Sequence, residues 1–366
     1  MKKKIVLLIA LFIMVALIAC GKEETDMSDD IMPTPVPASE ESESSDSGDS
    51  SSSEKKESAA PEKNKLPEGG FTVSESRLLD ANGNEFVMRG VNHAHAWFAQ
   101  YDETALAAIA KTGSNTVRIV CANGEQWTKD SETSIKKLID LCKENKMICV
   151  LEVHDATGKD EAEALSKAAN FWCSMKSVLN GNEAYVIVNI ANEWMGSWDT
   201  KKWADAYKTE IAKLRDAGIR NLIMVDAPGW GQYGQAIVDK GNEILDSDPE
   251  KNIIFSVHMY GTAGGSKSKI KNVLQGAIDK KLCIIVGEFG YYHSDGDVDE
   301  AYIMEFCTQN NLGYLGWSWK GNGGGVEYLD IAIEWDGSRL STDWGEVLIN
   351  GKNGIKETSK KCMIFD

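Results

Sequence analysis

Eight short apolar segments rich in β-branched residues recur between residues 86 and 319, and a longer stretch with helical periodicity follows each of them. Such segments are typical of parallel strands that are covered on both faces. The expected strands span residues 86–92, 116–120, 147–154, 185–192, 221–227, 253–260, 283–289 and 313–319. Eight strand–helix units in one continuous rhythm predict the α/β class and a single (β/α)8 TIM barrel over residues 71–366.

Local signals around these segments support the barrel. The stretches 131–145 and 203–218 are amphipathic, with Ser or Asp near the start and Asn or Gly at the end, as helix caps require. An open doubly wound sheet, the main alternative, calls for a GxGxxG turn after its first strand, but the first strand here leads into GVNHAHAW (90–97). Residues 71–85 contain an Asn-Gly turn and predict a hairpin that closes the N-terminal end of the barrel.

The first 20 residues are not part of this pattern. A basic MKKK precedes an apolar stretch that ends in LIAC (17–20), the pattern of a bacterial lipoprotein signal peptide. We expect cleavage before Cys20, lipidation of Cys20, and an extracellular, cell-surface location with the lipid as the only link to the membrane. An uncleaved anchor or an ordinary secretory signal is the alternative.

Residues 21–70 predict a disordered linker. The segment is rich in Ser, Glu and Pro, has almost no large apolar side chains, and carries 14 acidic against 5 basic residues. The whole chain has a formal net charge of -17, which argues against a nucleic-acid partner because such proteins present a basic face to the phosphates.

Cysteine usage indicates buried thiols and no metal centre. Besides Cys20 there are seven cysteines, an odd number that cannot pair completely within one exported chain. Cys149 and Cys283 stand inside apolar strands, where cysteine usually acts as a small hydrophobic residue. No CxxC pair suggests zinc, and we expect neither a metal nor a cofactor.

Polar and aromatic side chains gather where the expected strands end. In a (β/α)8 barrel these ends form the face that carries the chemistry. The residues are Asn92, His93, Arg118, His154, Asp155, Asn192, Glu193, Asp226, His258, Tyr260, Glu288, Trp317 and Trp319. A purely stabilising role would have scattered them over both ends of the barrel, so we expect a functional cleft at this face.

Two carboxylates in this set, Glu193 and Glu288, predict glycoside hydrolysis. They end the fourth and seventh strands, which lie almost opposite each other in an eight-stranded ring. Glycosidases use one carboxyl group to protonate the leaving oxygen and a second to attack or stabilise the sugar. A separation of about 5–5.5 Å favours retention of configuration, and one of about 6.5–9.5 Å favours inversion.

The neighbours of the pair fit such a site. His258 and Tyr260 are two residues apart on one strand and therefore point the same way. A tyrosine hydroxyl and the Arg118 guanidinium beside one carboxylate favour its ionised form, as a nucleophile requires. Trp317 and Trp319 are also two residues apart, and we expect them to form a flat floor for a pyranose ring.

These motifs together resemble glycoside hydrolase family 5, and within it the bacterial endo-β-1,4-mannanases. The resemblance covers every strand end, through FVMRGVNHAHAWF, GSNTVRIV, VLEVHDATG, IVNIANEWMGSWD, DAPGWGQY, FSVHMY, VGEFGYYHSDGDVDE and GWSWKGNG. It implies that Glu193 is the acid/base and Glu288 the nucleophile of a retaining enzyme. It also implies that Arg118, His154, Asn192, His258, Tyr260 and Trp317 surround the cleaved bond.

The implied partner is a β-mannan polysaccharide, hydrolysed by a monomer. An endo-β-1,4-glucanase remains an alternative, since the same face of the barrel serves both sugars. A surface glycan-binding lipoprotein without turnover is a second one. The sequence leaves open the preference among mannan, glucomannan and galactomannan.

Other motifs allow two interpretations each. We expect Asn92, His93 and Trp97 to add substrate contacts, and favour substrate contact or packing over metal binding for the His93–His95 pair. A solvated helix start is favoured over a calcium loop for the acidic run 295–300, which lacks the EF-hand spacing. The tryptophans near strand ends could line the cleft or pack beneath it; they are Trp97, Trp127, Trp194, Trp198 and Trp230.

Overall fold

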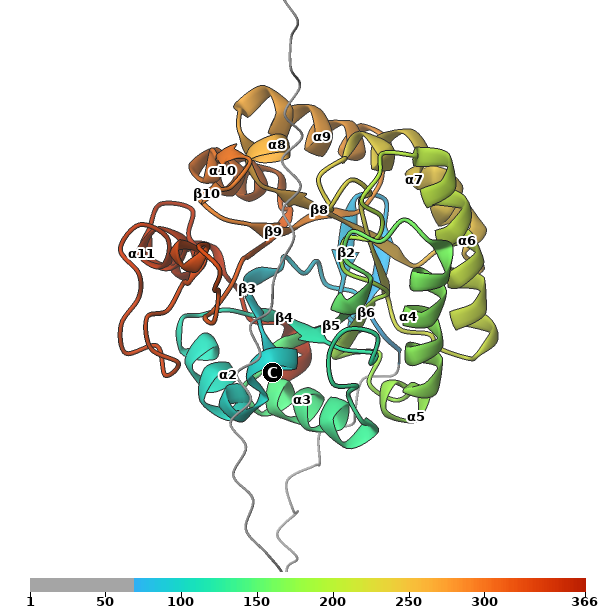
Figure 1. The fold of residues 1–366 in the computed structure, drawn as a ribbon, viewed down its shortest axis with the longest axis horizontal. Helices are drawn as coiled ribbons and strands as arrows, with labels where there is room; N and C mark the ends of the chain where they lie inside the picture. Colours follow the sequence, from blue (N-terminus) through green and yellow to red (C-terminus); the bar gives the residue numbers. More distant parts are fainter. Residues whose placement is uncertain (1–68) are drawn as a thin grey trace, which may run out of the picture. The chain divides into compact units, whose positions relative to one another are not determined.

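The computed structural model describes residues 69–366, in which eight parallel strands close into a barrel in the order β12-β3-β4-β5-β6-β7-β8-β9 (Figure 1). The barrel strands are β3 (Arg89–His93), β4 (Thr116–Cys121), β5 (Ile148–Val153), β6 (Val186–Asn189), β7 (Ile223–Asp226), β8 (Ile253–Met259), β9 (Ile284–Phe289) and β12 (Gly313–Gly316). The predicted (β/α)8 barrel and all eight strands are confirmed. The predicted signal peptide, Cys20 and linker lie outside the described residues.

A ring of helices surrounds the strands (Figure 1). The longer helices are α2 (Asp102–Lys111), α3 (Glu132–Glu144), α4 (Ala162–Ser174), α6 (Thr200–Asp216), α7 (Gln235–Ser247), α9 (Lys267–Asp279), α10 (Glu300–Asn310) and α11 (Gly345–Asn350). Short helices are α1 (His95–Phe98), α5 (Lys176–Leu179), α8 (Gly261–Gly264) and α12 (Ile355–Thr358), and 3₁₀ turns are η1 (Ala99–Tyr101), η2 (His154–Ala156), η3 (Glu327–Leu329) and η4 (Met363–Phe365). Two hairpins complete the fold, β1 (Thr72–Ser74) with β2 (Arg77–Leu79), and β10 (Tyr292–His293) with β11 (Gly296–Asp297).

Both helices singled out from the sequence form where expected, because side-chain caps satisfy their free N–H groups. Ser131 accepts a hydrogen bond from the N–H of Ser134 at the start of α3, and Asp199 accepts one from Lys202 at the start of α6.

Two apolar layers hold the barrel together. Successive residues of a strand point to opposite faces, so Ile148 and Val150 of β5 lie in the cluster inside the barrel, while Cys149 and Leu151 pack with helix residues outside it. Both faces of the strand are therefore buried, as its continuous apolar sequence predicts.

The N-terminal hairpin closes one end of the barrel. Phe71, Leu78 and Phe86 are buried in the same cluster as the interior strand residues. The predicted closure is confirmed, but the position of the turn is corrected. The strands reverse between Ser74 and Arg77, whereas the Asn-Gly dipeptide forms a second turn closed by hydrogen bonds between Asp80 and Asn84.

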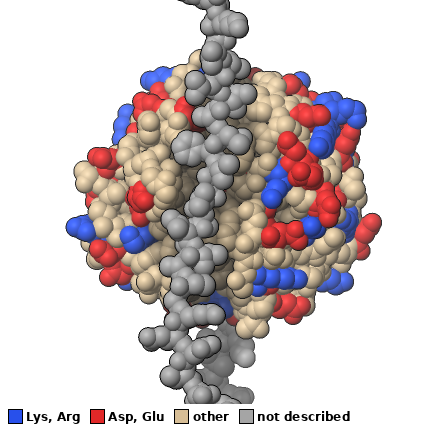
Figure 2. All heavy atoms as spheres, in the orientation of Figure 1, with Lys and Arg blue, Asp and Glu red and all other residues tan. Residues whose placement is uncertain are grey.

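All seven cysteines within residues 69–366 are free, and six of them are buried. The expected thiols at Cys149 and Cys283 pack with the two apolar clusters. Within the same residues, no helix combines the length and the apolar character needed to cross a membrane. On the face that Figure 2 presents, the visible Lys and Arg side chains are interspersed with Asp and Glu.

Replacing Arg215 with methionine should destabilise the barrel strongly. Arg215 and Asp248 are both buried and share two hydrogen bonds of 2.9 Å, so the substitution leaves a buried carboxylate without its cation. The expected loss in the free energy of unfolding is about 3–5 kcal/mol, measured by urea denaturation. Lys136→Met, which breaks the exposed pair with Asp140, should leave the urea midpoint nearly unchanged, and an equal shift in both variants would contradict the prediction.

Candidate active site

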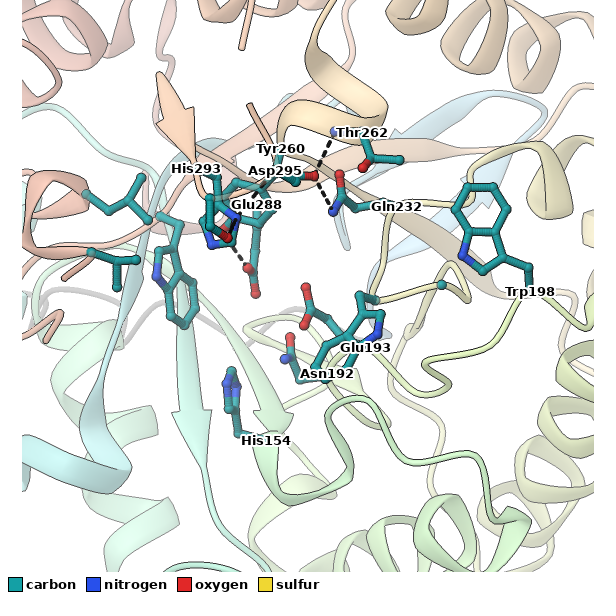
Figure 3. Close-up of a pocket in the computed structure, with 16 residues that line it drawn as sticks. His154, Asn192, Glu193, Trp198, Gln232, Tyr260, Thr262, Glu288, His293 and Asp295 are labelled. Atoms are coloured by element: carbon teal, nitrogen blue, oxygen red, sulfur yellow. Dashed lines mark hydrogen bonds and ion pairs between the residues drawn. The ribbon is translucent and has the colours of Figure 1, made fainter. Parts of the chain in front are cut away.

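The barrel brings the predicted carboxylate pair together. Glu193 follows β6 and Glu288 lies in β9, and the two side chains face each other across the open centre of the strand ends (Figure 3). One carboxylate oxygen of Glu193, one of Glu288 and one ring nitrogen of His258 lie within 4.8 Å of one another. This spacing agrees with the shorter separation of a retaining pair.

A cavity of about 440 Å³ opens over the pair. Four predicted substrate contacts line it, namely His154, Asn192, Tyr260 and Trp317. Residues that sequence reasoning did not assign also line it: Gln232, Thr262, His293, Ser294, Asp295, Val326 and Leu329. Thr262 lies in the short helix α8, His293 in β10 and Leu329 in η3, and the others are loop residues. None of them ends an expected barrel strand, so an inspection of strand ends did not assign them to the site.

Glu288 is the more enclosed of the two carboxylates. Arg118 Nη1 donates to one of its oxygens at 2.8 Å, and the Tyr260 hydroxyl donates to the other at 2.9 Å. Burial raises the pKa of Glu288, while the positive charges of His258 and Arg118 lower it. Since both hydrogen-bond partners donate, the surroundings of the side chain suit its ionised form.

Arg118 stands at the centre of the buried polar network. Besides Glu288, its guanidinium donates to Asn92, Asn189 and Asn192 at 2.7–3.0 Å. Burial alone would lower the pKa of Arg118, but the surrounding carboxylates raise it. A permanently charged, fully buried arginine therefore ties together the ends of four strands.

Glu193 differs from Glu288 in backbone and exposure. Its φ of 45° is in the left-handed region, which is unusual for a residue with a side chain. Its carboxylate reaches the cavity and contacts His258 Nδ1 at 2.8 Å. Burial alone would lower the pKa of His258, but the charges of Glu288 and Asp226 and the hydrogen bond to Glu193 raise it to about 9. A pKa of this size favours the protonated imidazole at neutral pH, with Nδ1–H toward Glu193.

A β-bulge at Gly287 of β9, opposite Val257 and His258 of β8, sets this arrangement. It shifts the register so that His258 pairs with Glu288 of β9. Bulges re-aim side chains in this way next to active sites.

His154 is held by an acid that sequence reasoning missed. Its Nδ1 lies 2.8 Å from Glu152, a fully buried residue two positions earlier on β5. The His154 ring is nearly parallel to Trp317, with centroids 5.7 Å apart. Glu152 lies within β5 and not at its end, so an inspection of the strand ends did not include it.

Two predicted substrate contacts are wrong, because Asn92 and Trp319 are completely buried. Asn92 donates to the carbonyls of Gly287 and Gly316 and accepts from Arg118, so it joins strands. Trp319 donates to the carbonyl of Trp335 and packs in the apolar core. β12 ends at Gly316, so the alternation expected to place Trp319 beside Trp317 does not extend that far.

The predicted substrate contact of His93 is also wrong. His93 is fully buried, and its Nε2 lies 2.9 Å from Asp102. His95 contacts the second oxygen of Asp102 through Nδ1 and Asp130 through Nε2. Burial lowers the pKa of His93. The packing interpretation of this histidine pair is the correct one.

The contacts of His95 with Asp102 and Asp130 predict that the free energy of unfolding falls between about pH 6.5 and 9. Burial alone would lower the pKa of His95, but hydrogen bonds to Asp102 and Asp130 raise it to about 9. The folded pKa exceeds the unfolded one of about 6.5, so the contribution is complete below pH 6.5 and disappears as the pH rises through 9. Urea unfolding at pH 6 and pH 9.5 should show a loss from His95 on the order of 2–3 kcal/mol.

His258 contributes with the same sign, so wild-type unfolding alone does not isolate His95. The variant His95→Gln should show a smaller loss between the two pH values than the wild type does. An identical pH dependence of both proteins would contradict the assignment.

The tryptophans divide between cleft and core. Trp198 and Trp230 are about half exposed, at 54% and 52%, and line the cavity. Trp194 is fully buried and donates to the carbonyl of Glu161. Trp97 lies edge-on to Trp127 and to His154, so it borders the site, and its predicted substrate contact stays a prediction.

Two carboxylates of the acidic run 295–300 accept hydrogen bonds from main-chain N–H groups. Asp295 accepts from the N–H groups of Gly261 and Thr262, and Asp299 caps α10 at the N–H of Tyr302. Within this described segment, the helix-start interpretation holds for Asp299, while Asp295 ties two loops of the cavity wall together.

Comparison with known proteins agrees with this geometry. The model of the family described as Cellulase (glycosyl hydrolase family 5) matches residues 79–323. The chain is 49% identical to a mannan endo-1,4-β-mannosidase of Salipaludibacillus agaradhaerens, over 81% of this chain and 96% of that protein. It is 46% identical to a mannan endo-1,4-β-mannosidase of Streptomyces lividans, over 81% of this chain and 78% of that protein.

Among solved structures, the β-mannanase from Thermomonospora fusca is similar, with a TM-score of 0.78 and 44% identity over 82% of this chain and 100% of that one. Its mannohexaose complex matches with a TM-score of 0.77 and 42% identity over the same shares of the two chains. The family model spans most of the barrel, and the relatives extend the match beyond it. The chain therefore belongs to glycosyl hydrolase family 5.

Proposed function

We propose that this chain is a retaining endo-β-1,4-mannanase that hydrolyses internal bonds of mannan, glucomannan or galactomannan. The observation that carries the proposal is the pairing of Glu193 and Glu288 within 4.8 Å beneath an open cavity. A separation this short favours a covalent intermediate over direct attack by water.

In the first step, a Glu288 oxygen attacks the anomeric carbon and forms a glycosyl ester. The bond from that carbon to the leaving sugar breaks, and Glu193 transfers its proton to the departing oxygen. In the second step, Glu193 takes a proton from a water molecule that attacks the same carbon, and the bond to Glu288 breaks. Two inversions give net retention, and both carboxyl groups return to their initial states.

The surrounding residues support these roles. Arg118 and Tyr260 donate to Glu288 and favour the ionised nucleophile. Asn192 uses its oxygen for Arg118 and one amide proton for Thr157, so its second amide proton is free for the 2-hydroxyl, which is axial in mannose. Trp317 at the cavity supplies a stacking surface for a pyranose ring.

The choice of mannan over cellulose rests on the relatives, since the geometry of the pair serves both sugars. Proteins named mannan endo-1,4-β-mannosidase are 41–49% identical to this chain, whereas one named Endoglucanase A is 29% identical. The half-exposed Trp198 and Trp230 line the same cavity, which suits a polysaccharide that continues past the cleaved bond.

One assay tests the proposal. Reducing ends released from linear mannan, glucomannan, galactomannan and a soluble cellulose derivative are measured for the wild type and for Glu288→Ala. We expect release from the mannans that disappears in the variant. Release from the cellulose derivative alone would overturn the assignment of mannan as the substrate. Binding without any release would favour the glycan-binding alternative.

We also propose that the chain is a monomer tethered to the outer cell surface by lipid on Cys20. The support is the signal-like sequence of residues 1–20 and the acidic, Ser-rich segment that follows. Expression in a bacterial host fed radiolabelled palmitate should label the wild type but not Cys20→Ser. Equal labelling of both proteins would overturn the proposal, and light scattering of the detergent-free 69–366 barrel should give the monomer mass.

A further inference from the structure

Asp226, the last residue of β7, is a completely buried carboxylate that lies directly behind Glu193. Its Oδ2 accepts the backbone N–H of Glu193 at 3.1 Å and Arg118 Nη2 at 3.2 Å. Its Oδ1 accepts Asn189 Nδ2 at 3.1 Å. Asp226 thus contacts the main chain of Glu193 and also Arg118, which in turn donates to Glu288.

The position demands a side chain that only accepts hydrogen bonds. The groups around Asp226 are an N–H of Glu193, a guanidinium of Arg118 and an amide of Asn189, and all of them donate. A carboxylate satisfies all three, whereas an asparagine would turn an NH₂ group toward one of these donors. The pattern indicates a need for charge and not merely for volume.

The contact to Glu193 matters because of its backbone. A φ of 45° is rarely populated by residues with a side chain and persists only where the surroundings fix it. The hydrogen bond from the Glu193 N–H to Asp226 joins that backbone to a buried residue of the neighbouring strand. The direction in which the Glu193 carboxyl points therefore depends on Asp226.

A second contact runs through His258. Its Nε2 is buried and makes no hydrogen bond, and Asp226 Oδ2 lies 3.5 Å from it. The opposite nitrogen, Nδ1, faces Glu193 at 2.8 Å and Glu288 at 3.5 Å. The carboxylates that face this imidazole thus come from β7, from β9 and from the loop after β6, and they hold it as a cation.

We propose that Asp226 is a positioning residue for the acid/base step: it fixes the Glu193 backbone in its left-handed conformation and lies against Nε2 of the His258 imidazole, whose Nδ1 contacts the Glu193 carboxyl group. This inference rests on the proposed function. It predicts a defect mainly in proton transfer, because the hydrogen bonds of Arg118 to Glu288, Asn189 and Asn192 do not involve Asp226.

The first measurement is leaving-group dependence. For Asp226→Asn, kcat/KM on mannohexaose should fall about 100-fold, since misplacing a catalytic group by about 1 Å has an effect of this size. On 2,4-dinitrophenyl β-mannobioside, whose leaving group needs no proton, kcat/KM should fall less than about fivefold. Equal losses on the two substrates would overturn the proposal, because a general structural defect affects both alike.

The second measurement is the titration of His258 by NMR on histidine-labelled protein, which is tractable because the chain has five histidines. The pKa of His258, about 9 in the wild type, should move toward the ordinary value of 6.5 in Asp226→Asn. An unchanged value would overturn the electrostatic part of the proposal. This readout needs no substrate, so it stands even if the mannan assay fails.

Two further variants complete the design. Asp102→Asn makes the same change at a buried aspartate that holds another imidazole, and it should lower the pKa of His95 while leaving His258 and the substrate ratio unchanged. Asp226→Glu keeps the charge but displaces it, so the pKa of His258 should stay high. Its kcat/KM should still fall much more on mannohexaose than on 2,4-dinitrophenyl β-mannobioside. If Asp226→Asn does not fold, equal losses on both substrates in Asp226→Glu would overturn the proposal. A wild type inactive on every mannan would instead refute the proposed function.

Discussion

Glycine in place of Glu288 should lower kcat/KM on mannan by about 10⁵-fold, since loss of a nucleophile removes the covalent route entirely. Sodium azide should restore turnover of 2,4-dinitrophenyl β-mannobioside, because the missing side chain leaves space beside Arg118 and Tyr260 for a small anion. The product should be the α-mannosyl azide, formed by one displacement on the face that Glu288 occupies. Product stereochemistry, read by NMR, checks this.

The matched variant is Glu193→Gly, which keeps the nucleophile. Here azide should attack the glycosyl ester on Glu288 and give the β-mannosyl azide, after two displacements. The two variants therefore report the two roles through opposite anomers. An α product from Glu193→Gly and a β product from Glu288→Gly would exchange the assignments. Glu334→Gly, at an exposed residue of the same chain, should keep wild-type activity.

Methionine in place of Arg118 should impair both stability and activity. The substitution removes the guanidinium from the buried carboxylates Glu288 and Asp226, with an expected cost of about 3–5 kcal/mol in the free energy of unfolding. Because the Arg118 charge lowers the pKa of Glu288, its loss should raise that pKa further. Glu288 must be ionised to attack, so the acid side of the kcat/KM profile should move to higher pH. Urea unfolding and a pH profile on mannohexaose measure both effects.

Arg89→Met is the control for this variant. Arg89 is also buried, but within residues 69–366 it pairs with no carboxylate; it donates to main-chain carbonyls and to Thr358, and it lies over the Tyr314 ring. Its loss should destabilise the fold without moving the acid side of the profile. A shift of equal size in both variants would show that general loosening, and not the charge on Glu288, sets the profile.

The barrel could be predicted because its information is local. Most of the strands are rich in β-branched residues and buried on both faces, and β5 shows the pattern, with Ile148 inside the barrel and Cys149 against the helices. The pair Glu193 and Glu288 could be predicted for a related reason, since the carboxyl ends of parallel strands meet at one face. Neither inference needed a contact between distant residues.

The depth of each side chain could not be predicted in this way. His93 and Trp319 also follow strand-like segments, yet both are fully buried. Their positions depend on partners distant in sequence or beyond the strand, Asp102 for His93 and the carbonyl of Trp335 for Trp319. Glu152 was missed, and Asp226 was placed at the strand ends but given no role, for the converse reason. Each looks like an ordinary acid in sequence, and only the assembled barrel shows the cations that face them.

The free cysteines allow opening of the folded chain to be followed by alkylation. Burial raises the pKa of the Cys121, Cys149 and Cys283 thiols, so little thiolate is present in the native state, and no alkylating reagent reaches them there. Cys173, which is only partly buried, is the one thiol of residues 69–366 open to such a reagent in the native state. Each further label therefore marks a molecule in which the segment around that cysteine has opened, and the mass of the labelled chain reports such openings without a denaturant.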